Sequence, residues 1–267
     1  MLHLLRLEIK KIKNYRPFQV MALLYLIALP ASLLVTKSLP EEVGMFFGSQ
    51  GFYTFPNVWR FLGYIGNWIG FFFLGFMGVL SITSEYGNKT LRQNIITGLS
   101  RKDYFSAKVI FIAGVSLAAT VYFFIVGTAI GLVHADPFYF DVYTQNLGYI
   151  PRFFLMCFGY MSLGLLMGTL VRRTGFAIFI FLAYGVFIES ILRGIHLYYT
   201  EHRSCIFYPV NAMEDLTPIP FPDMANEMIK EMEFHPFLSP TEAIITSSIY
   251  TAIFLFGVYR LLMKRDL

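Results

Sequence analysis

The 267-residue sequence has few charged side chains and almost no cysteine. Only 14% of its residues are Asp, Glu, Lys or Arg, whereas about 25% is usual in a soluble domain. This shortage excludes an ordinary water-soluble domain. The two cysteines are Cys157, in an apolar run, and Cys205, in a polar segment. Their settings do not suggest a pair, and we expect two free thiols.

The sequence also lacks an internal repeat and a recognisable signal peptide. Without a repeat, a barrel or a solenoid is not indicated. The first sixteen residues are charged, and the hydrophobic run after them exceeds the roughly 7 to 15 residues of a signal peptide's apolar region. We therefore expect the first run to remain in the mature protein as a membrane span.

Long apolar runs are abundant, since 56% of the residues are hydrophobic. A helix needs about 20 mostly apolar residues to cross the hydrocarbon core of a bilayer. The sequence predicts an all-α integral membrane protein, with one domain over residues 1–267. The predicted spans are residues 18–36, 61–82, 107–133, 149–171, 175–192 and 243–263.

The first sixteen residues have an amphipathic pattern. Apolar side chains recur at helical spacing on one face, and basic side chains fall on another, which is typical of a helix lying in the membrane interface. The alternative is a charged start to the first span. The apolar face comprises Leu2, Leu5, Ile9 and Ile12, and the basic face Arg6, Lys10 and Lys13.

Six spans place both chain ends on one side, and the basic residues indicate which side. The two ends, the polar stretch after the second span and the turn at Arg172 and Arg173 hold fifteen of the 21 Lys and Arg residues. Cytoplasmic loops carry the excess of Lys and Arg. We therefore predict a cytoplasmic (plasma or inner) membrane protein with both termini in the cytoplasm.

A polar, basic stretch over residues 84–108 separates the second and third spans. Asn88 suits a helix N-cap, no breaker occurs from Lys89 to Thr97, and Gly98 suits the left-handed position after a helix. Ser100 stands three residues before an aspartate, as in a capping box. The stretch therefore predicts a short helix, a sharp turn and a second helix that continues into the third span.

The predicted short helix has apolar as well as charged surface. Leu91 and Ile95 stack at i and i+4, as do Arg92 and Ile96. A small helix of this kind is suited to bind in a groove. We also expect Glu85, at the end of the second span, to pair with Arg92 or with an arginine further along, Arg101. The alternative is a set of solvated interface charges, which would not explain the capping residues.

This stretch resembles the cytoplasmic coupling region of type-2 ABC permeases, the six-span membrane subunits of ATP-binding-cassette exporters. The shared pattern is an acidic end to span two, a Thr-Leu step, a Gly-x-Ser-Arg turn and a lysine entering span three. The residues that carry it are Glu85, Thr90, Leu91, Gly98, Ser100, Arg101 and Lys108.

The resemblance implies a mechanical role for residues 84–106. A cytoplasmic ATPase subunit would bind the short helix, a second permease copy or a paralogue would complete a dimer, and membrane lipid would surround it. ATP and magnesium would reside in the partner, so this chain would carry no cofactor, no metal and no nucleic acid. The implied docking residues are Glu85, Asn88, Thr90, Leu91, Arg92, Ile95, Gly98, Ser100 and Arg101.

Two further functions compete with this interpretation. One is an intramembrane enzyme acting on lipid or peptide, using His196, Glu201, His202 or Glu189. The spacing of these residues fits no zinc-protease motif, so a metal site is disfavoured. The other is a non-transporting immunity or sensor protein of the same fold. No Walker A motif occurs, because the glycine-rich loop before Lys89 is missing.

Several polar and small residues lie inside or next to the apolar runs. Asn67 and Glu189 are candidates for a translocation pathway, although a structural hydrogen bond is favoured for Asn67 and an interfacial position remains open for Glu189. Two G-x-x-x-G pairs, at 127–131 and 164–168, favour close helix packing within one subunit over a dimer interface. The proline-rich residues 193–242 predict short interfacial or re-entrant helices outside the cell.

Overall fold

The computed structural model describes residues 2–37, 52–96, 98–135, 139–220 and 235–264, and all regular structure in these ranges is helical. Six helical segments are long and apolar enough to cross a membrane. This confirms the predicted fold class and the number of spans. Helices suit an apolar run in a bilayer because each one satisfies its own backbone hydrogen bonds.

The spans are built from one or more helical elements each. The first is α2 (Arg16–Lys37), and the second comprises α4 (Asn57–Ile69), the π-helix η1 (Gly70–Leu74) and α5 (Gly75–Gly87). The third is α7 (Arg101–Val133), and the fourth comprises α8 (Phe140–Thr144) and α9 (Tyr149–Val171). The fifth comprises α10 (Thr174–Leu182), the π-helix η2 (Ala183–Ile188) and α11 (Glu189–Thr200), and the sixth is α14 (Pro240–Lys264).

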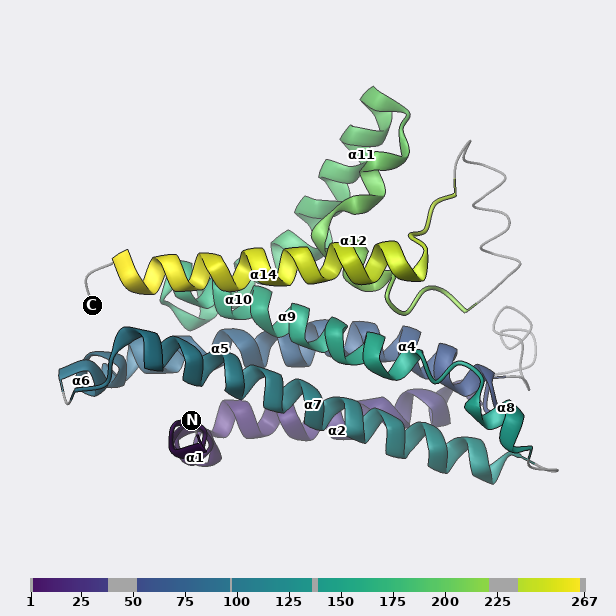
Figure 1. The fold of residues 1–267 in the computed structure, drawn as a ribbon, viewed down its shortest axis with the longest axis horizontal. Coiled ribbons are helices and arrows are strands. Elements are labelled where there is room, and N and C mark those ends of the chain that lie inside the picture. Colours follow the sequence, from purple (N-terminus) through teal and green to yellow (C-terminus); the bar gives the residue numbers. More distant parts are fainter. Residues whose placement is uncertain (1, 38–51, 97, 136–138, 221–234, 265–267) are drawn as a thin grey trace.

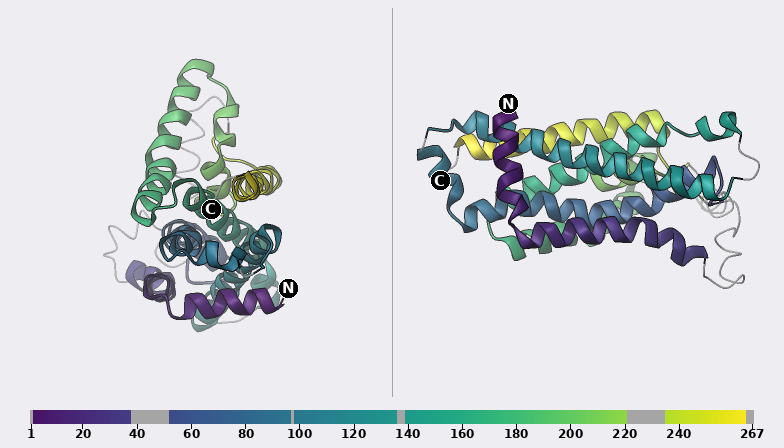
Figure 2. Two further views of the ribbon diagram at one scale, coloured as in Figure 1. Left: turned by 90° about the vertical axis from the view of Figure 1, so that its left-hand side faces the viewer. Right: turned by 90° about the horizontal axis from the view of Figure 1, so that it is seen from below.

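The second and fifth spans are longer than predicted. The second begins at Asn57 and ends at Gly87, and the fifth continues to Thr200. Hydropathy marks only the apolar middle of such helices, whereas helical backbone hydrogen bonds continue into their more polar ends. In Figures 1 and 2, α11 leaves the bundle, and the π-helix η2 lies at the bend.

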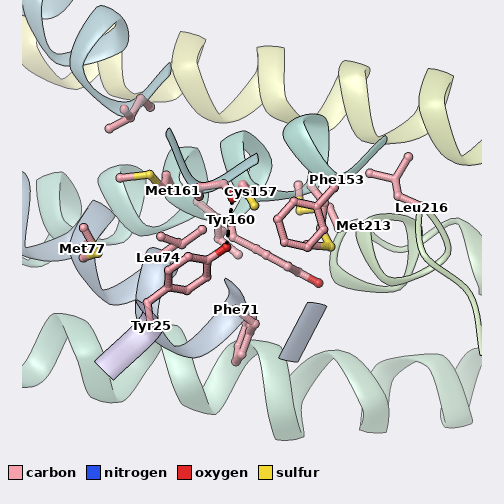
Figure 3. Close-up of a cluster of buried hydrophobic side chains, with 14 of the residues drawn as sticks. Tyr25, Phe71, Leu74, Met77, Phe153, Cys157, Tyr160, Met161, Met213 and Leu216 are labelled. Carbon is pink, nitrogen blue, oxygen red and sulfur yellow. Dashed lines mark hydrogen bonds between the residues drawn. The ribbon is translucent and has the colours of Figure 1, made fainter. Parts of the chain in front are cut away.

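Helix α9 lies at the centre of the bundle. Its Tyr160 and Phe153 are fully buried, and Figure 3 shows them among side chains from the second span and from the outer segment. The ring of Phe153 stacks on Phe123 of α7 with 4.2 Å between centroids. Aromatic side chains make up about a third of the buried hydrophobic residues, which accounts for part of the chain's aromatic content.

Close approach of α5 and α9 depends on glycine. A Cβ added at Gly164 would collide with the backbone carbonyl of Gly75, and one at Gly168 would lie 3.0 Å from the carbonyl of Val79. A Cβ added at Gly127 of α7 would lie 2.6 Å from the ring of Trp59 in α4. Both G-x-x-x-G pairs pack inside this chain, which confirms the prediction of intrasubunit packing.

Three elements gather at one end of the bundle. Helix α1 (Leu2–Lys13) lies across the long axis of the bundle, and α6 (Thr90–Ile96) and the end of α14 lie at the same end (Figures 1 and 2). The transverse direction of α1 suits the predicted interfacial helix, because such a helix lies in the membrane plane.

The segment between the fifth and sixth spans, predicted to lie outside and called the outer segment here, contains the short helices η3 (Arg203–Phe207) and α12 (Pro209–Glu214). It starts later than predicted, since α11 runs to Thr200, and its residues 221–234 lie outside the described residues. Cys157 and Cys205 are both free thiols, as predicted.

Candidate coupling site

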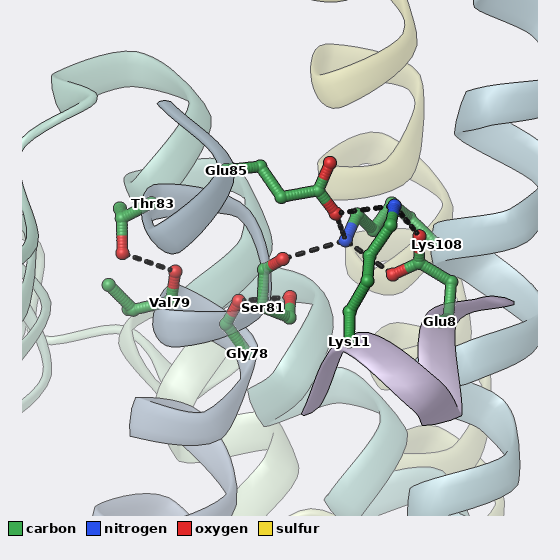
Figure 4. A network of polar contacts seen from close by, with 8 residues as sticks. All are labelled: Glu8, Lys11, Gly78, Val79, Ser81, Thr83, Glu85 and Lys108. Carbon is green, nitrogen blue, oxygen red and sulfur yellow. Dashed lines mark hydrogen bonds and ion pairs between the residues drawn. The ribbon is translucent and has the colours of Figure 1, made fainter. Parts of the chain in front are cut away.

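A buried ion-pair network joins α1, α5 and α7 at the end of the bundle that holds α6 (Figure 4). Lys108 of α7 is fully buried, and its Nζ lies 2.5 Å from Oε2 of Glu8. The same ammonium group donates to Oε1 of Glu85 and, at 2.7 Å, to the carbonyl of Ser81. The three N–H donors of this ammonium group are thus all hydrogen-bonded to acceptors on two other helices.

Lys11 completes the network from the rim. Its Nζ lies 2.8 Å from Oε1 of Glu8 and 3.3 Å from Oε1 of Glu85. Two ammonium groups therefore face two carboxylates, and the cluster is neutral. Burial by itself would raise the pKa of Glu8, but the nearby charges of Lys108 and Lys11 outweigh it and lower that pKa.

The predicted partners of Glu85 are wrong. Glu85 pairs with Lys108 and Lys11, whereas Arg101 donates to the carbonyls of Leu262 and Met263 at 3.0 Å each. These carbonyls end α14 and have no partner within a helix. Arg101 therefore joins the start of α7 to the end of the sixth span.

The helix boundaries in this stretch are partly as predicted. Asn88 is not an N-cap but the C-cap of α5, and Lys89 adopts a positive φ of 56°. The short helix therefore starts one residue later than predicted, at Thr90. The turn agrees with the prediction: Gly98 has a φ of 103°, and Ser100 caps α7 by accepting a hydrogen bond from the backbone N–H of Asp103.

Helix α6 has an inner and an outer face. Leu91 is 2% exposed and Ile95 is half-buried, so this predicted pair seats α6 on its own chain. Arg92 is exposed and Ile96 is 75% exposed. A partner protein on this side would therefore meet Arg92 and Ile96.

The two candidate pathway residues both contact the short helix α12. Glu189 is 2% exposed, and its oxygens accept the backbone N–H groups of Val210 and Asn211 at 3.0 and 2.8 Å. Asn67 donates to the carbonyl of Glu214 at 3.1 Å and accepts the hydroxyl hydrogen bond of Tyr160 at 2.6 Å. Each residue holds α12 against the bundle.

The histidines of the competing enzyme hypothesis do not form a metal cluster. Among the described residues, no group of three His, Cys, Asp or Glu side chains could hold a metal ion. Nε2 of His196 lies 2.9 Å from the hydroxyl of Ser204, and His202 caps η3. Glu201 forms the end of α11 with a φ of 48°. These contacts give each residue a local structural role.

Sequence reasoning missed Glu8 and Lys11 as members of the site. The available signal was that Glu8 is the only acidic residue among the first sixteen. A lone acid on a basic amphipathic helix indicates an internal partner, because the basic face otherwise favours further Lys or Arg.

The chain matches the family described as "ABC-2 family transporter protein" over residues 4–188. The chain belongs to this family. It is therefore a multi-pass membrane permease of an ABC transporter, and such a permease assembles with an ATPase. The match begins inside α1 and includes α6 and both sides of the ion-pair network. No curated protein matches the sequence.

Proposed function

We propose that this ABC-2 permease is the membrane subunit of an exporter whose ATPase binds the outer face of α6 from the cytoplasm. The observation that carries the proposal is the division of α6 into two faces. Leu91 is buried against the rest of the chain. Arg92 and Ile96, which each follow a residue of the inner pair Leu91 and Ile95, are exposed. An exposed arginine beside an exposed isoleucine suits a groove that is apolar and acidic.

The contacts behind α6 would carry its movement into the bundle. Two residues separate the end of α5 from α6, and a short turn joins α6 to the start of α7. Lys108 connects α7 to α5 and to α1, and Arg101 connects it to α14. A displacement of α6 would therefore act on the second, third and sixth spans and on the interfacial helix together.

ATP binding and hydrolysis would take place in the partner, which would hold ATP and magnesium. This chain would contribute the membrane passage and the docking helix. The contacts of Asn67 and Glu189 with α12 support a closed outer end, because both side chains hold a short helix over the bundle. Opening of the outer end would then require these hydrogen bonds to break or move with α12.

The distribution of basic residues supports the orientation. Residues 1–16, residues 84–108, the turn after α9 and the last residues of the chain hold fifteen of the 21 Lys and Arg residues, and the cytoplasmic side of a membrane protein holds this excess. The termini would lie in the cytoplasm, and α12 would lie outside. The chain would reside in the plasma or inner membrane.

A second permease copy would cover the fifth span. Helix α11 stands away from the bundle (Figure 1), and Ile191, Ile195 and Tyr198 on it are 59%, 50% and 78% exposed. An apolar helix with few contacts in its own chain gains packing from a partner helix. We therefore propose a dimer with two ATPase subunits.

Purification of the tagged full chain from its native membranes in mild detergent tests the proposed assembly. We expect an ABC ATPase to co-purify in equal amount, identified by peptides that include its Walker A motif, and native mass spectrometry to give a mass of two permeases with two ATPases. Repeated purification without any such ATPase, or ATP hydrolysis absent from the purified sample, would overturn the proposal.

A further inference from the structure

A cavity of about 250 Å³ lies between the interfacial helix and the start of the coupling region. Lys11, Asn14 and Tyr15 form one wall, and Ser84, Asn88 and Thr90 belong to the opposite one. Ser81 and Glu85 also contribute. The cavity therefore extends along α5 from residue 81 and past the end of this helix to the start of α6.

The walls of this cavity are rich in hydrogen-bond donors. Asn14 and Asn88 each carry an amide with two N–H groups, and Ser84 and Thr90 each carry a hydroxyl. The one acidic lining residue, Glu85, accepts from Lys108 and Lys11 through Oε1. These groups can donate several hydrogen bonds at once, so they suit an occupant with several acceptor oxygens.

Lys11 adds a positive charge with unused capacity. Its ammonium group has three N–H donors, of which one is directed to Glu8 and one to Glu85. The side chain is 30% exposed, so the third donor can reach an occupant of the cavity. A donor-rich cavity with one available ammonium N–H suits a phosphate group.

The position of the cavity indicates where the phosphate comes from. Helix α1 lies across the bundle (Figure 2), and an amphipathic helix of this kind lies at the depth of the lipid headgroups. The apolar side chain of Ile12 lines the same cavity, which provides a surface for the upper part of an acyl chain. Lys10 and Lys13 on the same helix are exposed and attract anionic lipid.

We propose that this cavity binds the phosphate group of a glycerophospholipid from the leaflet that holds α1. The lipid would bridge α1 to the junction of α5 and α6, with its phosphate on Lys11, Asn88 and Thr90. Occupancy would stabilise the coupling region, and loss of the lipid would loosen α1 from it. The site is separate from the exposed face of α6 that we assign to the ATPase.

Thermal unfolding of the purified full-length complex in detergent tests this site. Phosphatidylglycerol, diacylglycerol and inorganic phosphate are added separately at equal concentration. We expect phosphatidylglycerol to raise Tm by several degrees and the other two to leave it within about one degree. An equal shift from inorganic phosphate would show a soluble anion site and overturn the lipid proposal, as would an equal shift from diacylglycerol.

Variants locate the binding to the cavity. Thr90→Glu places a negative charge at the start of α6, a helix position that tolerates acids, and should remove most of the phosphatidylglycerol shift. Lys11→Ala should do the same, whereas Lys10→Ala, which removes the same charge from an exposed position of α1, should retain the shift. If Lys11→Ala fails to fold, Thr90→Glu alone decides.

Two results would overturn the assignment of this cavity. One is an equal loss of the shift in Lys10→Ala and Thr90→Glu, which would show attraction by surface charge alone. The other is a Thr90→Glu variant that keeps the full lipid shift, which would place the lipid outside the cavity. Loss of the ATPase from that same variant would assign the cavity to ATPase binding. Both readings come from the same samples, so failure of the lipid site and failure of ATPase docking are distinguishable.

Discussion

The ammonium group of Lys108 lies 2.5 Å from the carboxylate of Glu8, which precedes it by 100 residues in the chain. This pair fixes the interfacial helix to the third span. Both side chains are buried, so neither can exchange its partner for water. The amphipathic N-terminal helix is therefore part of the folded bundle as well as a surface element.

Removal of the Lys108 charge should destabilise the protein strongly. Lys108→Met leaves the buried carboxylates of Glu8 and Glu85 without their main partner, and breaking a buried pair in this way costs about 3–5 kcal/mol. Thermal unfolding in detergent measures the effect. Lys102→Met, at an exposed position of the same helix, is the control, and an equal change in both variants would contradict the proposed role of the pair.

Glu189→Gln should loosen α12. The variant replaces one accepting oxygen by an amide N–H that faces the backbone N–H of Val210 or Asn211, and an unsatisfied buried donor costs about 1–3 kcal/mol. Hydrogen exchange of residues 209–214 should become faster. Glu201→Gln, at an exposed position, should leave it unchanged. Unaltered exchange in Glu189→Gln would show that this carboxylate does not hold α12.

The outer segment should lose stability as the pH rises. Burial raises the pKa of Asp215 from 3.8 to about 7, against the opposing effects of the Leu238 N–H and of Arg193. Between these two values the folded protein keeps a proton that the unfolded chain has released, so stability falls with increasing pH through this window and levels off above it.

Thermal unfolding from pH 5 to pH 8 measures this dependence. Asp215→Asn cannot titrate and should reduce the slope, leaving the contribution of Glu214, whose pKa burial also raises to about 7. An exposed acid such as Asp103 can be changed to Asn without this effect. A wild-type Tm that increases over the range would contradict the raised pKa.

The contact between α5 and α9 should not tolerate a side chain at Gly164. A methyl group there collides with the carbonyl of Gly75, so Gly164→Ala should destabilise the protein by about 1–3 kcal/mol. Gly114→Ala is the matched control, because nothing lies within 4 Å of an added Cβ there and alanine favours the helix. Equal Tm values for the two variants would show that α5 and α9 can separate.

The sequence predicted the number of spans, a helix at the N-terminus and the turn at Gly98 and Ser100, because each depends on a local pattern of apolar, capping or small residues. It did not predict the partner of Glu85. Arg92 and Arg101 are closer to Glu85 in sequence than Lys108 is, and only the packing of α1, α5 and α7 selects Lys108.

The same limit applies inside the membrane. Asn67 and Glu189 were recognised as unusual, since polar groups in apolar runs require partners. Their partner, α12, is only six residues long, which is too short to display a helical pattern in the sequence. Glu189 lies 21 positions from Val210, and Asn67 lies 147 positions from Glu214. Contacts over such separations depend on the tertiary fold, which single-sequence patterns do not contain.

The most direct test of the account is ATPase binding by a permease altered on the outer face of α6. Arg92→Glu with Ile96→Asp changes only exposed side chains, and Arg173→Glu, at an exposed position of the turn after α9, controls for loss of charge at the same end of the bundle. We predict that the double variant purifies folded, with unchanged Tm, but with at least tenfold less ATPase than the wild type, while Arg173→Glu retains it. A double variant that keeps its full ATPase content and ATP-driven transport would contradict docking on α6.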